Sequence, residues 1–469
     1  MPSATVQFDA WEGHYARRLA SLRHSAVRDL FAAVSRPDVI GLSGGMPDIS
    51  VLPLEQVAEC AADCIRKEGV RALQYAGSLG RLECRRVVCD TLAELDIAAT
   101  PDDVILTGGS QSALDLLAKI FIDPGDVIIT EGPTYLGALQ AFSAYEPRVI
   151  HIELDENGMR VDLLEERLRE LGPHGAKFIY TIPSFQNPSG VTMSLDRRTR
   201  LIELSRAYEI PIIEDDPYGR LRYEGDPVPA IKSMDSSVIY LGTVSKIFAP
   251  GLRLAWVVAP HAVIEKVNLA KQGACLCTSP MNEVMVERYF TDVDWHATQR
   301  RVIALYRRRR DAMLSALAEL FPPEVTWTHP AGGFFIWVTL PRYFDSDQLL
   351  SCALKAGVAF VPGAGCFYNG EGRNSLRIAF CYEEPEVLRE GIRRLAEAIS
   401  DRMDLYRAFL AVGALPESPQ PAPGKNTLDS ESPASASASV ARETPDRAHP
   451  RSAATTGAAG SARTIKEES

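Results

Sequence analysis

Six short apolar runs recur through the middle of the chain, and they constrain its fold more than any other feature. They are VILT (104–107), VIIT (127–130), KFIYTIP (177–183), IPIIED (210–215), SVIYLGT (237–243) and LAWVV (254–258). Strands this uniformly apolar are buried on both faces, as in a mainly parallel sheet covered by helices. Segments with helical periodicity alternate with the runs, so the sequence predicts an α/β fold.

The remaining segments suggest further units. With 469 residues, 46% of them hydrophobic, the chain is long enough for two or three domains. Within 330–382, GGFFIWVTLP, DQLLSCALKAG, VAFVPG and LRIAF follow the order strand, helix, strand, strand, which predicts a smaller α+β unit. We therefore expect an N-terminal arm packed on the small domain (1–50), a large domain (51–305), a small domain (306–412) and a tail (413–469).

The tail is rich in Pro, Ser, Ala, Thr and Gly from about residue 417. It has too few large apolar side chains to offset the entropy of ordering, so we expect it to be disordered. The N-terminal arm contains a helical pattern near 16–34 and the turn GLSGGMPD (41–48).

Charge and cysteine content limit the partners. The net charge of -11 argues against nucleic acid or an anionic membrane surface as a partner. The first twenty residues lack a signal-peptide pattern, and no window of eighteen apolar residues is free of charge, so we expect a cytoplasmic protein that binds small molecules. The nine cysteines have no disulfide-framework spacing and no neighbouring histidines arranged as ligands, so we predict no metal site.

Polar residues follow the runs at the sheet edge where open parallel sheets bind ligands. Ser110 and Gln111 open a helix after the first run, and free N–H groups at a helix start suit a phosphate. Tyr135 follows the second run and could stack on a flat ring. Asn187 follows the third run and is fixed by a proline and a turn glycine.

The last runs supply charged groups in apolar surroundings. Asp215 and Tyr218 end the fourth run, where a carboxylate is half desolvated unless it meets a cation. Lys246 lies in the apolar stretch 237–258, where desolvation favours the neutral amine that attacks a carbonyl and forms a Schiff base. Each residue alone also has a structural explanation, such as a capping aspartate or a salt-bridged lysine. In combination they supply the groups that one cofactor needs.

These residues resemble the fold-type I pyridoxal-phosphate enzymes, specifically the class I aminotransferases and, within them, the branch of 2-aminoadipate and kynurenine aminotransferases. The resemblance runs from about residue 28 to about residue 395. It is carried by LQYAGSLG (73–80), GGSQSALDL (108–116), EGPTYLGAL (131–139), FQNPSG (185–190), EDDPYG (214–219), TVSKIFAPGLRLAW (243–256), PAGGFFIW (330–337) and NSLRIAF (374–380).

The resemblance implies roles around pyridoxal 5'-phosphate (PLP). Lys246 would hold the cofactor covalently and then move the proton of the substrate α-carbon. Asp215 would pair with the pyridine nitrogen, Asn187 and Tyr218 would bind the ring's phenolic oxygen, and Tyr135 would stack on the ring.

The phosphate would bind to a second group of residues. These are Ser110, Gln111, Thr243, Ser245 and Arg253, whose guanidinium can grip two oxygens. Family members often have serine where this chain has Thr243, which keeps the hydroxyl.

Further residues would bind the substrate or the partner subunit. Arg377, with Asn187 beside it, would bind the α-carboxylate, and Gly45 would let the N-terminal arm lie close over the substrate. Arg28 would lie near the distal end of the substrate. Tyr75 would reach the active site of the neighbouring subunit in a homodimer.

The resemblance implies an aminotransferase that exchanges an amino group between an L-amino acid and a 2-oxo acid, with 2-oxoglutarate as one partner, in a ping-pong cycle. Elimination, decarboxylation or ring formation with the same cofactor is an alternative. A PLP-binding regulatory module is another, although only forty residues precede GLSGG, too few for a winged-helix domain. A dinucleotide-binding oxidoreductase is disfavoured, because no run is followed by the spaced glycine fingerprint. The identity of the amino donor stays open.

Overall fold

The computed structural model describes residues 9, 11–22, 36 and 38–412. The chain divides into two compact units, Met1–Ser418 and Pro419–Ser469, and every described residue belongs to the first. Arg28, most of the helix expected near 16–34 and the tail 413–469 lie outside the described residues. The four predicted domain boundaries stay a prediction.

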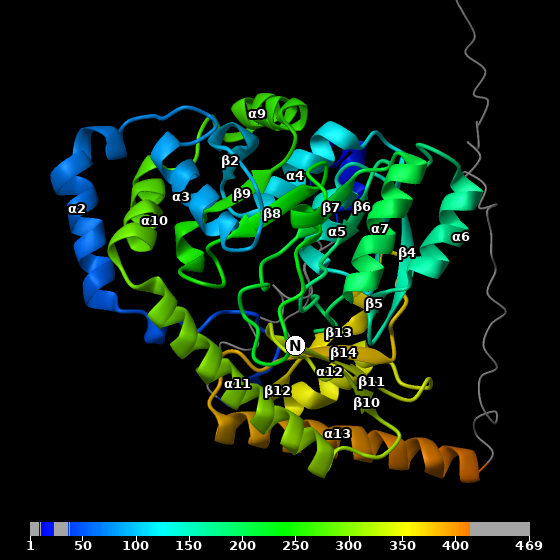
Figure 1. Ribbon diagram of the computed structural model, residues 1–469. Coiled ribbons are helices and arrows are strands. Elements are labelled where there is room, and N and C mark those ends of the chain that lie inside the picture. Colours follow the sequence, from blue (N-terminus) through cyan, green and yellow to red (C-terminus); the bar gives the residue numbers. More distant parts are fainter. Residues whose placement is uncertain (1–8, 10, 23–35, 37, 413–469) are drawn as a thin grey trace, which may run out of the picture. The chain divides into compact units, whose positions relative to one another are not determined.

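An eight-stranded sheet forms the centre of this unit (Figure 1). Its strands, in spatial order, are β2 (Val104–Thr107), β9 (Ala255–Val258), β8 (Ile239–Thr243), β7 (Ile212–Asp215), β6 (Ile179–Thr181), β3 (Val127–Gly132), β4 (Arg148–Asp155) and β5 (Gly158–Met159). Strands β8, β7, β6, β3 and β4 pair in parallel, whereas β9 is antiparallel to both its neighbours and β5 is antiparallel to β4. The predicted α/β class with a mainly parallel sheet is confirmed.

The six apolar runs all contain strands of this sheet. Every residue of β2, β6, β7, β8 and β9 is buried, as the uniform apolarity predicts. Successive strand residues point to opposite faces, and Ile128 and Ile129 accordingly belong to different hydrophobic clusters. Helices must therefore cover both faces of the sheet.

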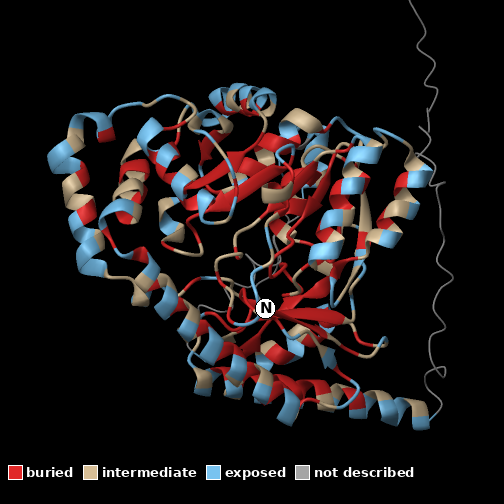
Figure 2. Cartoon of the chain, in the orientation of Figure 1, coloured by how far each residue is buried: buried red, intermediate tan, exposed pale blue. Residues whose placement is uncertain are grey.

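One face is covered by helices α4, α5 and α9, and the other by α3, α6, α7, α8 and α10. Figure 2 shows the buried sheet between helices whose outer surfaces are exposed. The bounds are α3 (Leu82–Ala93), α4 (Ser110–Phe121), α5 (Leu136–Ser143), α6 (Val161–Leu171), α7 (Leu195–Tyr208), α8 (Ile231–Met234), α9 (His261–Cys275) and α10 (Pro280–Asp292). Among the helices that the structure describes, none has the length and hydropathy to cross a membrane.

A second sheet is antiparallel, with the order β10 (Thr326–Trp327), β11 (Phe335–Thr339), β14 (Ser375–Ala379) and β13 (Val361–Pro362). Helices α11 (Trp295–Leu320), α12 (Ser346–Lys355) and α13 (Pro385–Ala411) pack around it. The end of the N-terminal arm joins this part of the chain, because β1 (Ile40–Gly41) pairs in parallel with β12 (Val358–Ala359). The predicted α+β pattern of 330–382 is confirmed.

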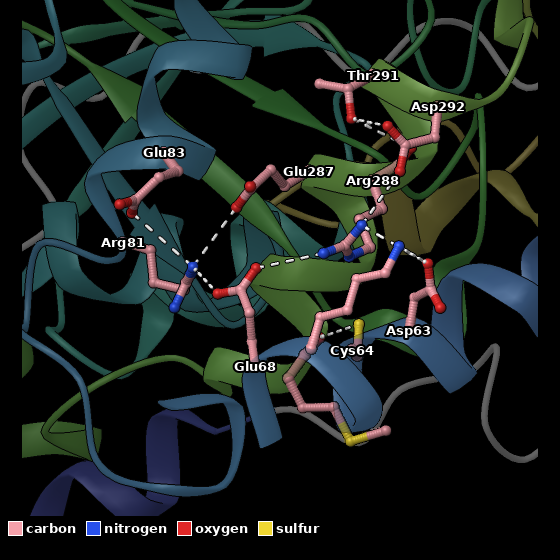
Figure 3. A network of polar contacts seen from close by, with 11 residues as sticks. Asp63, Cys64, Glu68, Arg81, Glu83, Glu287, Arg288, Thr291 and Asp292 are labelled. Atoms are coloured by element: carbon pink, nitrogen blue, oxygen red, sulfur yellow. Dashed lines mark hydrogen bonds and ion pairs between the residues drawn. The ribbon is translucent and has the colours of Figure 1, made fainter. Parts of the chain in front are cut away.

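Charged side chains tie helix α2 (Leu54–Leu73) to α3 and α10 (Figure 3). Arg81, at the start of α3, has a side chain only 9% exposed and lies 2.6 Å from Glu68 and 3.8 Å from Glu287. Arg288 of α10 lies 3.5 Å from the other oxygen of Glu68. Lys271 donates a hydrogen bond to the Ser78 carbonyl. Contacts at Ser78 and Arg81 therefore fix the second half of the segment 74–81, which belongs to no helix.

Candidate active site

A cavity of about 730 Å³ opens at the carboxyl ends of β3, β6, β7 and β8. It is lined by nearly all the residues that the sequence singles out: Gly45, Ser110, Gln111, Tyr135, Asn187, Asp215, Tyr218, Thr243, Ser245, Lys246, Arg253 and Arg377. Tyr75 does not line it and is 79% exposed, and Arg28 lies outside the described residues. The predicted groups thus meet at the carboxyl ends of the parallel strands, where open sheets bind ligands.

Lys246 lies in the cavity wall just after β8. Its Nζ donates to the Gly45 carbonyl at 2.7 Å and lies 5.5 Å from the centre of the Phe334 ring. Desolvation lowers the pKa of Lys246 to about 8, so a substantial fraction is the neutral, nucleophilic amine near that pH. Gly45 has no room for a side chain, because a Cβ there would lie 2.6 Å from Phe335.

Asp215 ends β7 and is fully buried at the base of the cavity. The Tyr180 hydroxyl donates to Asp215 Oδ2 at 2.8 Å, whereas Oδ1 has no hydrogen-bond partner among the described residues. Burial raises the pKa of Asp215 to about 7. A protonated ring nitrogen placed against Oδ1 would satisfy this orphaned oxygen and stabilise the carboxylate.

An anion cradle forms at the N-terminus of α4. Ser110 begins the helix, and its buried hydroxyl has no partner among the described residues. Gly109 has a φ of +93°, and a Cβ at this position would lie 2.2 Å from Arg253 Nη2, so the backbone and the guanidinium approach closely. Thr243 donates to the Ser245 hydroxyl at 2.9 Å. Helix N–H groups, hydroxyls and one guanidinium together suit a phosphate.

Arg377 reaches the cavity from β14 of the second sheet. Its Nη1 donates to Asn187 Oδ1 at 2.9 Å and its Nη2 to the Ser43 carbonyl at 2.7 Å. Its Nε is buried without a partner among the described residues, and the guanidinium lies 4.2 Å from the centre of the Phe335 ring. This arrangement suits a carboxylate that replaces the Ser43 carbonyl.

Two tyrosines complete the wall. The Tyr135 hydroxyl donates to Gln111 Oε1 at 3.4 Å, and Gln111 Nε2 donates to the Gly137 carbonyl at 2.6 Å. Tyr218 packs edge-on against Phe334 at 5.4 Å between ring centres, and burial raises its pKa. A flat ring could therefore meet Tyr135 on one side while Tyr218 approaches from another.

Sequence reasoning missed other residues of the wall and its support. The cavity is also lined by Leu22, Leu136, Gly137, Gln140, Ile182, Pro217, Pro250 and Phe335. Behind the wall, Glu131 accepts a hydrogen bond from Gln186. No local signal in the sequence identifies Glu131, because a carboxylate at the end of β3 resembles any polar residue before a turn.

Comparison with known proteins places the chain in a family. Residues 37–395 match the model of the family described as aminotransferase class I and II. The chain belongs to this family. It is 44% identical over 400 residues to aromatic-amino-acid aminotransferase 1 of Thermococcus litoralis, covering 84% of this chain and 95% of that protein. It is 36% identical to the 2-aminoadipate transaminase of Thermus thermophilus, covering 84% of this chain and 99% of that one.

A solved aminotransferase structure is also similar to this chain. The kynurenine aminotransferase of Pyrococcus horikoshii superposes on the aminotransferase chain with a TM-score of 0.81 at 42% identity, covering 84% of this chain and 98% of that one. The chain is thus a PLP-dependent aminotransferase that acts on amino acids, as the sequence resemblance predicts. The cavity fits PLP, because Asp215 Oδ1 and the Ser110 hydroxyl are buried polar atoms that the ring nitrogen and the phosphate would satisfy.

Proposed function

We propose that this aminotransferase exchanges an amino group between an L-amino acid and a 2-oxo acid in a ping-pong cycle, with 2-oxoglutarate as one partner. The observation that carries the proposal is the joint placement of Lys246, Asp215 and Arg377 around one cavity. They supply a low-pKa amine, an orphaned buried carboxyl oxygen and a guanidinium with an unused donor. When bound, PLP supplies an aldehyde that condenses with amines and a ring that accepts electrons from the α-carbon.

Different residues would hold the ring and the phosphate of the cofactor. We assign Asp215 to the ring nitrogen, Asn187 and Tyr218 to the ring oxygen, and Tyr135 to the ring face. Asn187 uses its Oδ1 to accept from Arg377, which leaves its Nδ2 to donate to the ring oxygen. The phosphate would bind to Ser110, Gln111, Thr243, Ser245 and Arg253.

Lys246 and Arg377 would act on the substrate. Arg377 would exchange its bond to the Ser43 carbonyl for the substrate α-carboxylate, which fixes the α-carbon in the cavity. Lys246 Nζ would then accept the α-proton as a neutral base, since its lowered pKa keeps a fraction of it unprotonated.

The donor range would include aromatic L-amino acids. Apolar side chains of Leu22, Leu136 and Phe335 line the cavity, and the relative from Thermococcus litoralis is named for aromatic amino acids. Gln140 adds one polar group to the wall.

A homodimer would complete the site with Tyr75. The side chain is 79% exposed and lies close in sequence to exposed apolar residues of α2, among them Val70 at 88% and Leu73 at 69%. Exposed aliphatic side chains grouped on one helix favour a protein interface. A cytoplasmic location stays a prediction, which rests on the first twenty residues and on the lack of a long uncharged apolar window.

The test mixes purified protein and PLP with one amino donor at a time. We expect the absorbance band of bound PLP to convert to that of the amino form while one 2-oxo acid appears, and later addition of 2-oxoglutarate should yield glutamate. Release of ammonia or carbon dioxide without the amino form would instead support the lyase or decarboxylase alternative.

A further inference from the structure

Glu131 is a buried carboxylate with no role in the chemistry proposed above. It lies in β3, is 1% exposed and forms no ion pair with any residue between 38 and 412. Burial raises the pKa of Glu131 to about 7. A carboxylate buried without a cation is costly unless hydrogen bonds compensate it, so its contacts call for an explanation.

Among the described residues, the hydrogen-bond donors to the Glu131 carboxylate come from β6 and the loop that follows it. The Thr181 hydroxyl donates to Oε1 at 2.5 Å and the Ile182 N–H to Oε2 at 3.2 Å. Gln186 Nε2 donates to Oε2 at 3.0 Å. A carboxylate, which only accepts, matches this set of donors better than an amide would.

Gln186 connects two loops that border the cavity. Its Nε2 also donates to the Pro133 carbonyl at 2.8 Å, and its Oε1 accepts from the Ser189 N–H at 2.8 Å. Pro133 belongs to the loop that leads to Tyr135, and Ser189 follows Asn187. The bonds made by Glu131 and Gln186 therefore tie the loop after β3 to the loop after β6.

We propose that Glu131 and Gln186 are positioning residues that set Tyr135 and Asn187 against the cofactor ring. Glu131 touches no ligand itself and acts by orienting Gln186. This inference rests on the proposed function, because it assumes that Asn187 Nδ2 donates to the ring oxygen. That bond would be sensitive to small shifts of the loop, since hydrogen bonds weaken steeply with misalignment.

Glu214 offers a matched control. It is also fully buried, on strand β7 of the same sheet, and burial raises its pKa to about 7. Its carboxylate accepts from the backbone N–H groups of Ile231 and Lys232 in α8, which do not line the cavity. Neutralising Glu214 removes a comparable buried charge without affecting the two loops.

The experiment records the absorbance of bound PLP against pH in Glu131→Gln, Glu214→Gln and the unmodified enzyme. An N–H donor to the ring oxygen favours the charged form of that oxygen. Losing the Asn187 bond should therefore raise the pH midpoint of the absorbance change by about one unit in Glu131→Gln. In Glu214→Gln the midpoint should move by less than about 0.3 unit. Equal shifts in both variants would overturn the proposal.

Two further variants keep the test decisive. Gln186→Met, which is close in size, should raise the midpoint as Glu131→Gln does, and an unchanged midpoint would overturn the proposal even if Glu131→Gln fails to fold. Combining Glu131→Gln with Gln186→Glu restores a donor and acceptor between the two positions, but a carboxylate cannot donate to the Pro133 carbonyl, so the midpoint should stay raised. If the unmodified enzyme shows no PLP absorbance at all, the proposed function itself fails, which distinguishes the two ideas.

Discussion

The buried carboxyl of Asp215 makes the stability of the protein depend on pH. Its pKa is raised from 3.8 to about 7 in the folded, cofactor-free protein, so the native state binds more protons than the unfolded state between these values. Stability from this group is therefore full at low pH and declines as the pH rises towards 7.

We expect cofactor-free Asp215→Asn to be more stable than the unmodified protein at pH 8 by on the order of 2 kcal/mol, and to be equally stable at pH 4. Denaturant unfolding at the two pH values measures this. With PLP bound, the same variant should lose several powers of ten in kcat. A variant with near-normal turnover would show that the ring nitrogen lies elsewhere.

Arg377 and Arg373 provide a comparison on neighbouring positions. Arg377→Ala should raise KM for all amino acids by about a hundredfold, because it removes a charge-assisted contact worth about 3 kcal/mol. Arg373 is 67% exposed and pairs with Asp345 on the surface, so Arg373→Ala should leave KM unchanged. Steady-state kinetics with several donors measures both, and an unchanged KM in Arg377→Ala would place the carboxylate elsewhere.

The turn before helix α4 depends on one of two adjacent glycines. Gly109→Ala would force a positive φ on alanine and place a methyl group against Arg253, whereas a Cβ at Gly108 has its nearest neighbour at 3.9 Å. We expect Gly109→Ala to weaken PLP binding at least about tenfold and Gly108→Ala to bind normally. Fluorescence titration with PLP compares them, and equal affinities would contradict the close approach of the backbone to Arg253.

His151 of β4 connects the large sheet to the loop after Cys366. Its Nε2 accepts from the Tyr368 N–H at 2.8 Å, so Nδ1 carries the proton and donates to the Glu131 carbonyl at 2.9 Å. Burial lowers the pKa of His151 below 6.5. The neutral form is thus the one that the native state needs.

Stability should therefore fall as the pH drops below 6.5, where the unfolded state gains a proton that folded His151 resists. His151→Gln keeps an acceptor near Tyr368 but does not titrate. We expect this variant to remove about 1 kcal/mol of the acid destabilisation, measured as unfolding free energy between pH 5 and 7.5. Identical pH profiles would assign the acid sensitivity to other groups.

The predictability of each element follows from its burial. Strands β2, β6, β7, β8 and β9 are evident from sequence because both faces are covered. Strand β4 was missed, since most of its residues are half-buried or exposed and its polar and apolar residues mix. The run VAFVPG reads as one strand, but it changes partners at Phe360, pairing first with β1 and then with β14. Such a switch depends on tertiary contacts that a local pattern does not contain.

Site residues that depend on tertiary contacts are equally hard to predict from sequence. Residues that would touch the cofactor occupy strand ends and could be identified from type and position. Glu131 and Gln186 act through other side chains, so nothing in their local sequence separates them from ordinary polar residues at a turn. Only the bonds between the two loops reveal them.

At the scale of the whole molecule, we predict which surface joins the two subunits. If the exposed face of α2 forms the interface, Val70→Asp should shift the protein from dimer to monomer. Leu405→Asp on α13, where the leucine is 48% exposed, serves as the control and should stay dimeric. Sedimentation equilibrium measures the mass, and a dimeric Val70→Asp variant would place the interface on another surface.

The stretch from Ser43 to Gly45 contacts both side chains that we assign to the substrate, since its carbonyls accept from Arg377 and from Lys246. Backbone oxygens of one loop therefore satisfy both nitrogens, and cofactor and substrate would have to displace them. Any carboxylate that enters the cavity would have to compete with these tethered carbonyls for the same N–H donors.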